Sequence, residues 1–78
     1  MPTFHYSVDD EPFETHLEVM TPREILDIAK FDPQKFYLIQ IEGDHDVSYE
    51  GKLDERIHMH NDMKFITAKI GPTPVSSS

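Results

Sequence analysis

The sequence contains no cysteine and few basic residues, and each shortage excludes a class of chemistry. Without cysteine there is no disulfide bond, no thiolate metal site and no cysteine nucleophile. Seven lysines and arginines stand against fifteen aspartates and glutamates, which gives a formal net charge of -8. Because phosphate binding needs a basic face, this charge argues against a nucleic-acid partner. It favours encounters with basic protein surfaces, or simply keeps a small domain monomeric.

Long apolar runs are also missing. No segment approaches the roughly 20 apolar residues that a membrane-spanning helix needs, so we expect no membrane association. The first thirteen residues, MPTFHYSVDDEPF, lack the basic start and apolar run of a secretory signal, and we expect a cytoplasmic protein. A chain of 78 residues is expected to form one domain with a modest core.

Alternation of apolar and polar residues predicts a β-hairpin at the start of the chain. Residues 4–8 (FHYSV) and 13–19 (FETHLEV) place apolar side chains at alternate positions, as half-buried strands do. Between them, DDEP at residues 9–12 is a dense turn signal. Two alternating runs around a short acidic turn are typical of a hairpin.

The clearest local signal is a helix start in TPRE, residues 21–24. The threonine can cap a helix, the proline suits its first position, and the glutamate completes a capping box. Met20 and Ile25 have the spacing of a hydrophobic staple. The Asp32-Pro33 pair disfavours helical geometry, so we expect a helix of about ten residues that ends before it.

Three further strands are expected in the second half of the chain. Residues 36–44 form a dense apolar run typical of a central strand, and residues 64–70 (KFITAKI) should be the last strand. A short edge strand is expected around Val47 to Tyr49, and residues 56–60 (RIHMH) form a short strand or a turn. The core is expected to contain Phe4, Phe36, Ile39, Ile41, Phe65 and Ile66.

This order of elements predicts a two-layer α+β domain, with a mixed four- to five-stranded sheet and one helix packed on one face. By analogy with domains of the same order, the first and last strands should meet as a central parallel pair, in a β-grasp. We expect the domain to occupy residues 1–70 and an extended tail to occupy residues 71–78.

These segments resemble the small ubiquitin-like domains of the bacterial multiubiquitin family. The resemblance spans roughly residues 3–76 and is carried by three motifs: F-x-Y-x-V, TPREILDIAKFDPQKFYLIQ and KFITAKIGPTPVS. It implies a ubiquitin-like β-grasp fold and a protein modifier that performs no catalysis itself. It also implies an activating enzyme, a conjugating enzyme, a deconjugating peptidase and protein targets as partners, in a bacterial conjugation system associated with anti-phage defence.

In such a modifier the C-terminal tail carries the function, because its carboxylate is adenylated and passed on as an acyl group. Pro72 should end the last strand, since proline cannot donate to a sheet, and P-T-P favours an extended segment. Eukaryotic relatives end in Gly-Gly, which this tail lacks; a trimming peptidase, an adapted enzyme channel and absence of conjugation remain open. The segment expected to be activated or processed comprises Gly71, as a hinge, and Pro72, Thr73, Pro74, Val75 and Ser76.

The sheet face that the helix leaves open is a candidate docking surface. Its candidate residues are Leu38, Ile66 and Ala68, provided that their side of each strand points outward, and Met59 and Met63 could join them. The alternative function is a non-covalent β-grasp self-assembly or adaptor module. In that case the edge strand near residues 47–49, or the tail, would pair with a neighbour's sheet.

Two histidine motifs are candidate chemical sites. His58 and His60 would share one face of a strand and could bind zinc with Asp54 or Asp62, but a convincing third ligand is missing, so we expect no metal and no cofactor. His45-Asp46 with Ser48 suggests a general base and a nucleophile. Adjacent residues of an extended segment point apart and nothing supplies an oxyanion hole, so we do not expect an enzyme. The acidic turns also lack the spacing of a calcium loop.

Overall fold

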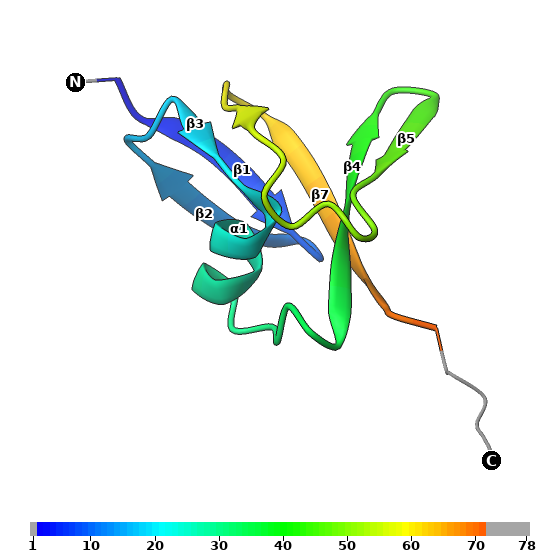
Figure 1. Ribbon diagram of the computed structural model, residues 1–78. Helices are drawn as coiled ribbons and strands as arrows, with labels where there is room; N and C mark the ends of the chain where they lie inside the picture. The colour runs from blue at the N-terminus through cyan, green and yellow to red at the C-terminus, as the bar shows by residue number, and fades with distance from the viewer. Residues whose placement is uncertain (1, 72–78) are drawn as a thin grey trace, which may run out of the picture.

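The computed structural model of the protein describes residues 2–71 as a mixed sheet with one helix packed on it (Figure 1). The elements in chain order are β1 (Phe4–Val8), β2 (Glu11–Thr15), β3 (Val19–Met20), α1 (Pro22–Ile28), β4 (Phe36–Glu42), β5 (His45–Ser48), β6 (Ile57–His58) and β7 (Met63–Lys69). Five strands form the main sheet in the order β2-β1-β7-β4-β5, and β3 pairs with β6 separately. Strands β1 and β7 are parallel, and the other neighbours are antiparallel. The expected α+β class is confirmed.

The predicted first hairpin is present, but its turn is tighter than expected, because Glu11 and Pro12, assigned to the turn from the sequence, belong to β2. Strands β1 and β2 pair around the two-residue turn Asp9-Asp10, in which both residues have a positive φ (51° and 69°). The second strand was predicted to continue to Val19 but ends at Thr15. Val19 instead starts β3, where it lies opposite His58 of β6. Leu17, predicted to share a face with Phe13, is 50% exposed between the two strands.

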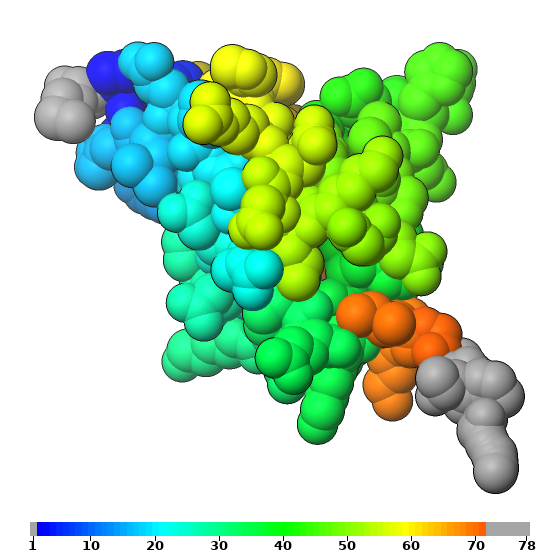
Figure 2. Space-filling view, viewed as in Figure 1, coloured from blue at the N-terminus to red at the C-terminus, as the bar shows by residue number. Residues whose placement is uncertain are grey.

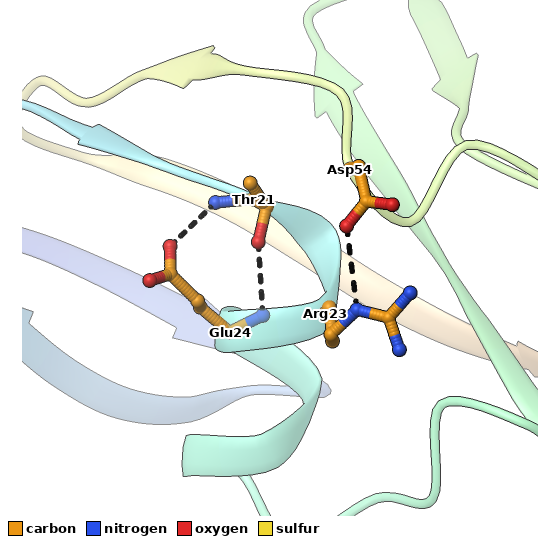
Figure 3. A network of polar contacts seen from close by, with 4 residues as sticks. All are labelled: Thr21, Arg23, Glu24 and Asp54. Atoms are coloured by element: carbon orange, nitrogen blue, oxygen red, sulfur yellow. Dashed lines mark hydrogen bonds and ion pairs between the residues drawn. The ribbon is translucent and has the colours of Figure 1, made fainter.

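The helix starts as predicted and ends early. The Thr21 side chain accepts a hydrogen bond from the Glu24 N–H (3.3 Å), and the Glu24 carboxylate accepts one from the Thr21 N–H at 2.9 Å (Figure 3). The helix has seven residues because Lys30 adopts a left-handed conformation, with φ 69°. The Phe31 N–H then donates to the Leu26 carbonyl (2.8 Å), and the Lys30 N–H donates to the Asp27 carbonyl (3.0 Å). These two bonds form a Schellman motif with lysine at the position usually held by glycine.

The core lies between the sheet and a layer formed by α1 and the segment that leads to β6. This segment, yellow-green in Figure 2, lies in the middle of that view. Its buried apolar residues are Tyr6, Val8, Met20, Ile25, Leu26, Leu38, Ile57, Met59, Met63 and Phe65. Of the predicted core residues, Phe65 is fully buried, and Phe4 and Phe36 pack against the cluster half-buried. The prediction was wrong for Ile39, Ile41 and Ile66, which lie on the other face of the sheet.

The Asp9 side chain ties the first hairpin to the last strand. One carboxylate oxygen accepts a hydrogen bond from the Thr67 N–H (2.9 Å), and the other accepts one from the Thr67 hydroxyl (2.6 Å). The Asp9 N–H also donates to the Phe65 carbonyl (2.9 Å). These bonds continue the contact between β1 and β7 beyond the last paired residues, Val8 and Phe65. The acidic turn therefore has a structural role that its sequence did not reveal.

Candidate docking face

An apolar patch lies on the face of β4 and β7 that α1 does not cover. Three cross-strand pairs define it: Tyr37 opposite Ala68, Ile39 opposite Ile66, and Ile41 opposite Lys64. Directly opposed residues of an antiparallel pair point to the same side of the sheet. The alternate residues Leu38 and Phe65 are fully buried on the helix side, so the three pairs point away from the core. We call the apolar members, Tyr37, Ile39, Ile41, Ile66 and Ala68, the β4–β7 patch.

The structure separates the predicted docking residues. Ile66 is 37% exposed and Ala68 is half-buried, and both belong to the β4–β7 patch. Leu38 has no exposed surface and faces the helix, so this candidate was wrong. Met59 and Met63 were also wrong, because both are buried in the core. The register between β4 and β7 decides whether the even-numbered or the odd-numbered side chains of each strand face the helix.

Tyr37, Ile39 and Ile41 are patch residues that the sequence did not identify. The run FYLIQIE, residues 36–42, is apolar at five of its first six positions, so both faces of the strand looked equally suited to the core. Their pairing with β7 identifies them. Each lies opposite an even-numbered residue of β7, whereas the buried Phe65 is odd-numbered. The patch is therefore a property of strand register and not of one segment.

The chain leaves the sheet at the end of β7. The Ile70 N–H still donates to the Lys35 carbonyl (2.8 Å), which extends the ladder with the start of β4 by one residue. Gly71, the last described residue, has no left-handed φ, and a Cβ added to it would meet nothing within 4 Å. Local structure therefore does not require glycine there, and its role as a hinge stays a prediction. The other expected tail residues, Pro72 to Ser76, lie outside the described residues.

A small cavity of about 230 Å³ lies beside this exit, lined by Arg23, Pro33, Phe36, Tyr37, Gly51, Leu53, Asp54 and Ile70. At its rim, Arg23 Nε lies 3.4 Å from Asp54 Oδ1, as Figure 3 shows. Their side chains are 51% and 83% exposed, so this ion pair contributes little to stability. The cavity is smaller than the roughly 300–1,000 Å³ of typical small-molecule sites.

The histidine motifs do not assemble into sites. His58 and His60 are exposed on either side of the buried Met59, and no three ligating side chains come together within residues 2–71. On β5, His45 lies opposite Glu42, whereas Asp46 lies opposite Ile41 on the other face. The Ser48 hydroxyl accepts a hydrogen bond from the Glu50 N–H (3.2 Å). A base and a nucleophile are therefore not brought together on this strand.

The fold raises the pKa of two tyrosine side chains. Burial raises the pKa of Tyr6 above its ordinary value of 10.0, and no described residue pairs with its hydroxyl. Burial also raises the pKa of Tyr49, and the charges of Glu42 and Glu55 add to this effect. The Tyr49 hydroxyl donates to Oε1 of the buried Gln40 (3.3 Å), which gives this polar side chain a partner in the core.

Among residues 2–71, no helix is long and apolar enough to cross a membrane. Comparison with protein families, with curated proteins and with solved structures found no match to the chain. The resemblance to ubiquitin-like domains therefore stays a prediction. The description of the β4–β7 patch, and of the point where the chain leaves the sheet after β7, rests on the geometry of this chain alone.

Proposed function

We propose that the chain is a ubiquitin-like protein modifier with a β-grasp fold, used by a bacterial conjugation system in anti-phage defence. The observation that carries the proposal is the strand order β2-β1-β7-β4-β5 with its central parallel pair β1 and β7. A hairpin, one helix and a last strand returning between β1 and β4 is the arrangement expected of a β-grasp. Within residues 2–71, the motifs that carry the family resemblance fall on β1, α1, β4 and β7.

In this function the protein is a substrate of its enzymes and not a catalyst. The carboxylate at the end of the mature chain would attack the α-phosphate of ATP, releasing pyrophosphate and leaving an acyl adenylate on the activating enzyme. A conjugating enzyme would then accept the acyl group with release of AMP and pass it to a nucleophilic group of a protein target, and a peptidase would hydrolyse that bond again with water. Residues 71–76 would enter the catalytic channels while the folded body stays outside, in the cytoplasm.

The β4–β7 patch supports the proposal because β7 carries both the patch and the exit of the tail. Ile66 and Ala68 lie on the same strand that continues through Ile70 to Gly71. An enzyme that docks on this patch would therefore hold the tail close to its own catalytic centre. The net charge of -8 favours partners whose docking surfaces are basic.

The first experiment is intact mass spectrometry of the protein after incubation with ATP and the activating and conjugating enzymes of the same system. The matched control is a chain that ends at Gly71. We expect an adduct on an enzyme or a target with the full chain and none with the truncated chain. Absence of any adduct with the full chain, both with and without the peptidase of the same system, would contradict the proposal.

The patch is tested by Ile66→Lys, with Leu17→Lys as the control. Both positions are exposed in the folded protein (37% and 50%), so a lysine at either should cost little stability. A charge in the middle of an apolar contact should slow adduct formation at least ten-fold for Ile66→Lys, while Leu17→Lys reacts like the parent. Equal rates for both variants would show that the enzymes do not use this patch.

A second candidate function is a non-covalent self-assembly or adaptor module. The observation that favours it is β5, whose four residues are all exposed at one end of the sheet. Oligomers that grow with protein concentration in native mass spectra, without nucleotide or enzymes, would support this candidate. A monomer at all concentrations would reject its self-assembly form.

A further inference from the structure

The two edges of the sheet offer different backbone groups to an incoming strand. In an antiparallel ladder, residues whose N–H and C=O face the partner strand alternate with residues whose groups face away. The Tyr49 N–H donates to the Leu38 carbonyl (2.9 Å), in register with the pairing of β4 and β5. Tyr49 therefore faces β4, as do His45 and Val47 by alternation. It follows that Asp46 and Ser48 turn their backbone groups to the outer edge.

The outer edge of β2 presents fewer hydrogen-bond donors to an incoming strand. The Asp62 N–H donates to the His5 carbonyl (2.8 Å), so odd-numbered residues of β1 face β7 and even-numbered ones face β2. The even-numbered residues of β1 pair with Glu11, Phe13 and Thr15 of β2, so the backbone groups of these three face β1. The backbone groups of Pro12 and Glu14 therefore face the outer edge. Because proline has no N–H, this edge presents one strand donor, whereas β5 presents two.

We propose that the outer edge of β5 accepts an extended, basic segment of another protein by strand addition. Within residues 2–71, no strand pairs with this edge, and all four residues of β5 are exposed. The N–H and C=O groups of Asp46 and Ser48 would bond to the added strand, as in other cases of strand addition. This inference concerns a surface away from the tail and does not depend on conjugation; it specifies the adaptor form of the second candidate function, which rests on the same edge.

Charge selects the occupant. Glu42, Asp44, Asp46 and Glu50 surround the β5 edge within nine residues, and His45 is the one basic side chain among them. A lysine or arginine placed opposite Asp46 on the added strand would form a favourable cross-strand pair. A second copy of this chain would instead bring two acidic hairpins together, each on a body with a charge of -8.

The probe is a ten-residue peptide that alternates lysine with threonine, added to the full 78-residue chain. Amide hydrogen exchange followed by NMR should show at least ten-fold slower exchange for the Asp46 and Ser48 amides at saturation. The amides of His45 and Val47, already bonded to β4, should change little. Unchanged exchange at Asp46 and Ser48, or slowing confined to another edge or face, would overturn the proposal.

Two variants separate the backbone from the charge. Asp46→Pro removes an outward N–H and copies the arrangement at Pro12, without removing a bond to β4, so we expect at least ten-fold weaker peptide binding. Asp46→Asn keeps the N–H and should weaken binding only about three-fold, as expected when one exposed ion pair is lost. Circular dichroism checks folding, and the exchange experiment on the parent chain tests the proposal even if Asp46→Pro does not fold.

A peptide in which glutamate replaces lysine is the charge control and should not bind detectably. Equal binding of the two peptides, or of the parent and a folded Asp46→Pro variant, would refute a basic strand at this edge. Dimers of the parent chain that Asp46→Pro abolishes would assign the edge to a second copy and overturn the proposal.

Discussion

Replacing Asp9 by glycine removes the two side-chain hydrogen bonds that connect the first turn to Thr67 of β7. Hydrogen bonds that involve a charged group contribute about 1.5–3 kcal/mol when shielded from water. Asp9 is exposed, so we discount this figure and expect the pair of bonds to contribute about 1.5 kcal/mol. Glycine adopts the φ of 51° found at this position freely, so the substitution introduces no strain of its own.

The matched control is Asp10→Gly. Asp10 is the second residue of the same turn, has a similar φ of 69°, and its side chain forms no hydrogen bond with the described residues. Both variants gain the same flexibility in the unfolded chain, so the difference between them isolates the carboxylate bonds. We expect Asp9→Gly to unfold at a Tm about 6–12 °C below that of Asp10→Gly.

Urea unfolding followed by circular dichroism measures the free energy of unfolding of each variant. Thr67→Val keeps the N–H that bonds to Asp9 and removes the hydroxyl, so it should lose about half of the effect. The double variant should lose less than the sum of the two single changes, because both remove the same bond. Equal stability of the two glycine variants, or full additivity of Asp9→Gly and Thr67→Val, would refute the reasoning.

Three further changes test other parts of the fold. Lys30→Gly should raise the free energy of unfolding, measured in urea titrations, by about 1 kcal/mol, because glycine suits the left-handed position that ends α1. A lower free energy of unfolding would contradict the Schellman assignment. Tyr6→Phe should stabilise the fold by up to about 1 kcal/mol, since the buried hydroxyl has no partner among the described residues; strong destabilisation would reveal a missing partner. Burial raises the pKa of Tyr6 and Tyr49 in the folded state, so the unfolded chain loses these protons first. The free energy of unfolding should therefore fall as the pH rises above about 10, and less steeply in Tyr49→Phe; an equally steep fall in that variant would exclude Tyr49 as a cause.

Features set by neighbouring residues were predictable from the sequence. The capping box around Thr21 depends on contacts three residues apart, and the first hairpin depends on one turn and its flanking strands. The early end of α1 was not predictable, because lysine gives no sign of the left-handed conformation that Lys30 adopts. The Phe31 N–H bonds to the Leu26 carbonyl in the same Schellman motif.

Features set by pairing of distant strands were missed. Leu38 and Ile39 are adjacent and similarly apolar, and only the register with β7 makes the first a core residue and the second a patch residue. The contact of Asp9 with Thr67 joins residues 58 positions apart, beyond any local pattern. The open face and two of its residues, Ile66 and Ala68, were therefore predicted, but Tyr37, Ile39 and Ile41 of the β4–β7 patch were missed and Leu38 was wrongly included.

The central position of β7 also has a consequence for the order of folding. This strand is the last of the described chain, yet it pairs with β1 on one side and β4 on the other. No shorter portion of the chain can close the sheet, because the hairpin of β1 and β2 and the hairpin of β4 and β5 remain separate until residues 63–69 arrive. Pairing of such distant segments slows folding, so the nascent domain should stay open until synthesis has passed this strand. Under the proposed function, the enzymes would then meet a tail held in its working position only on domains whose sheet is complete.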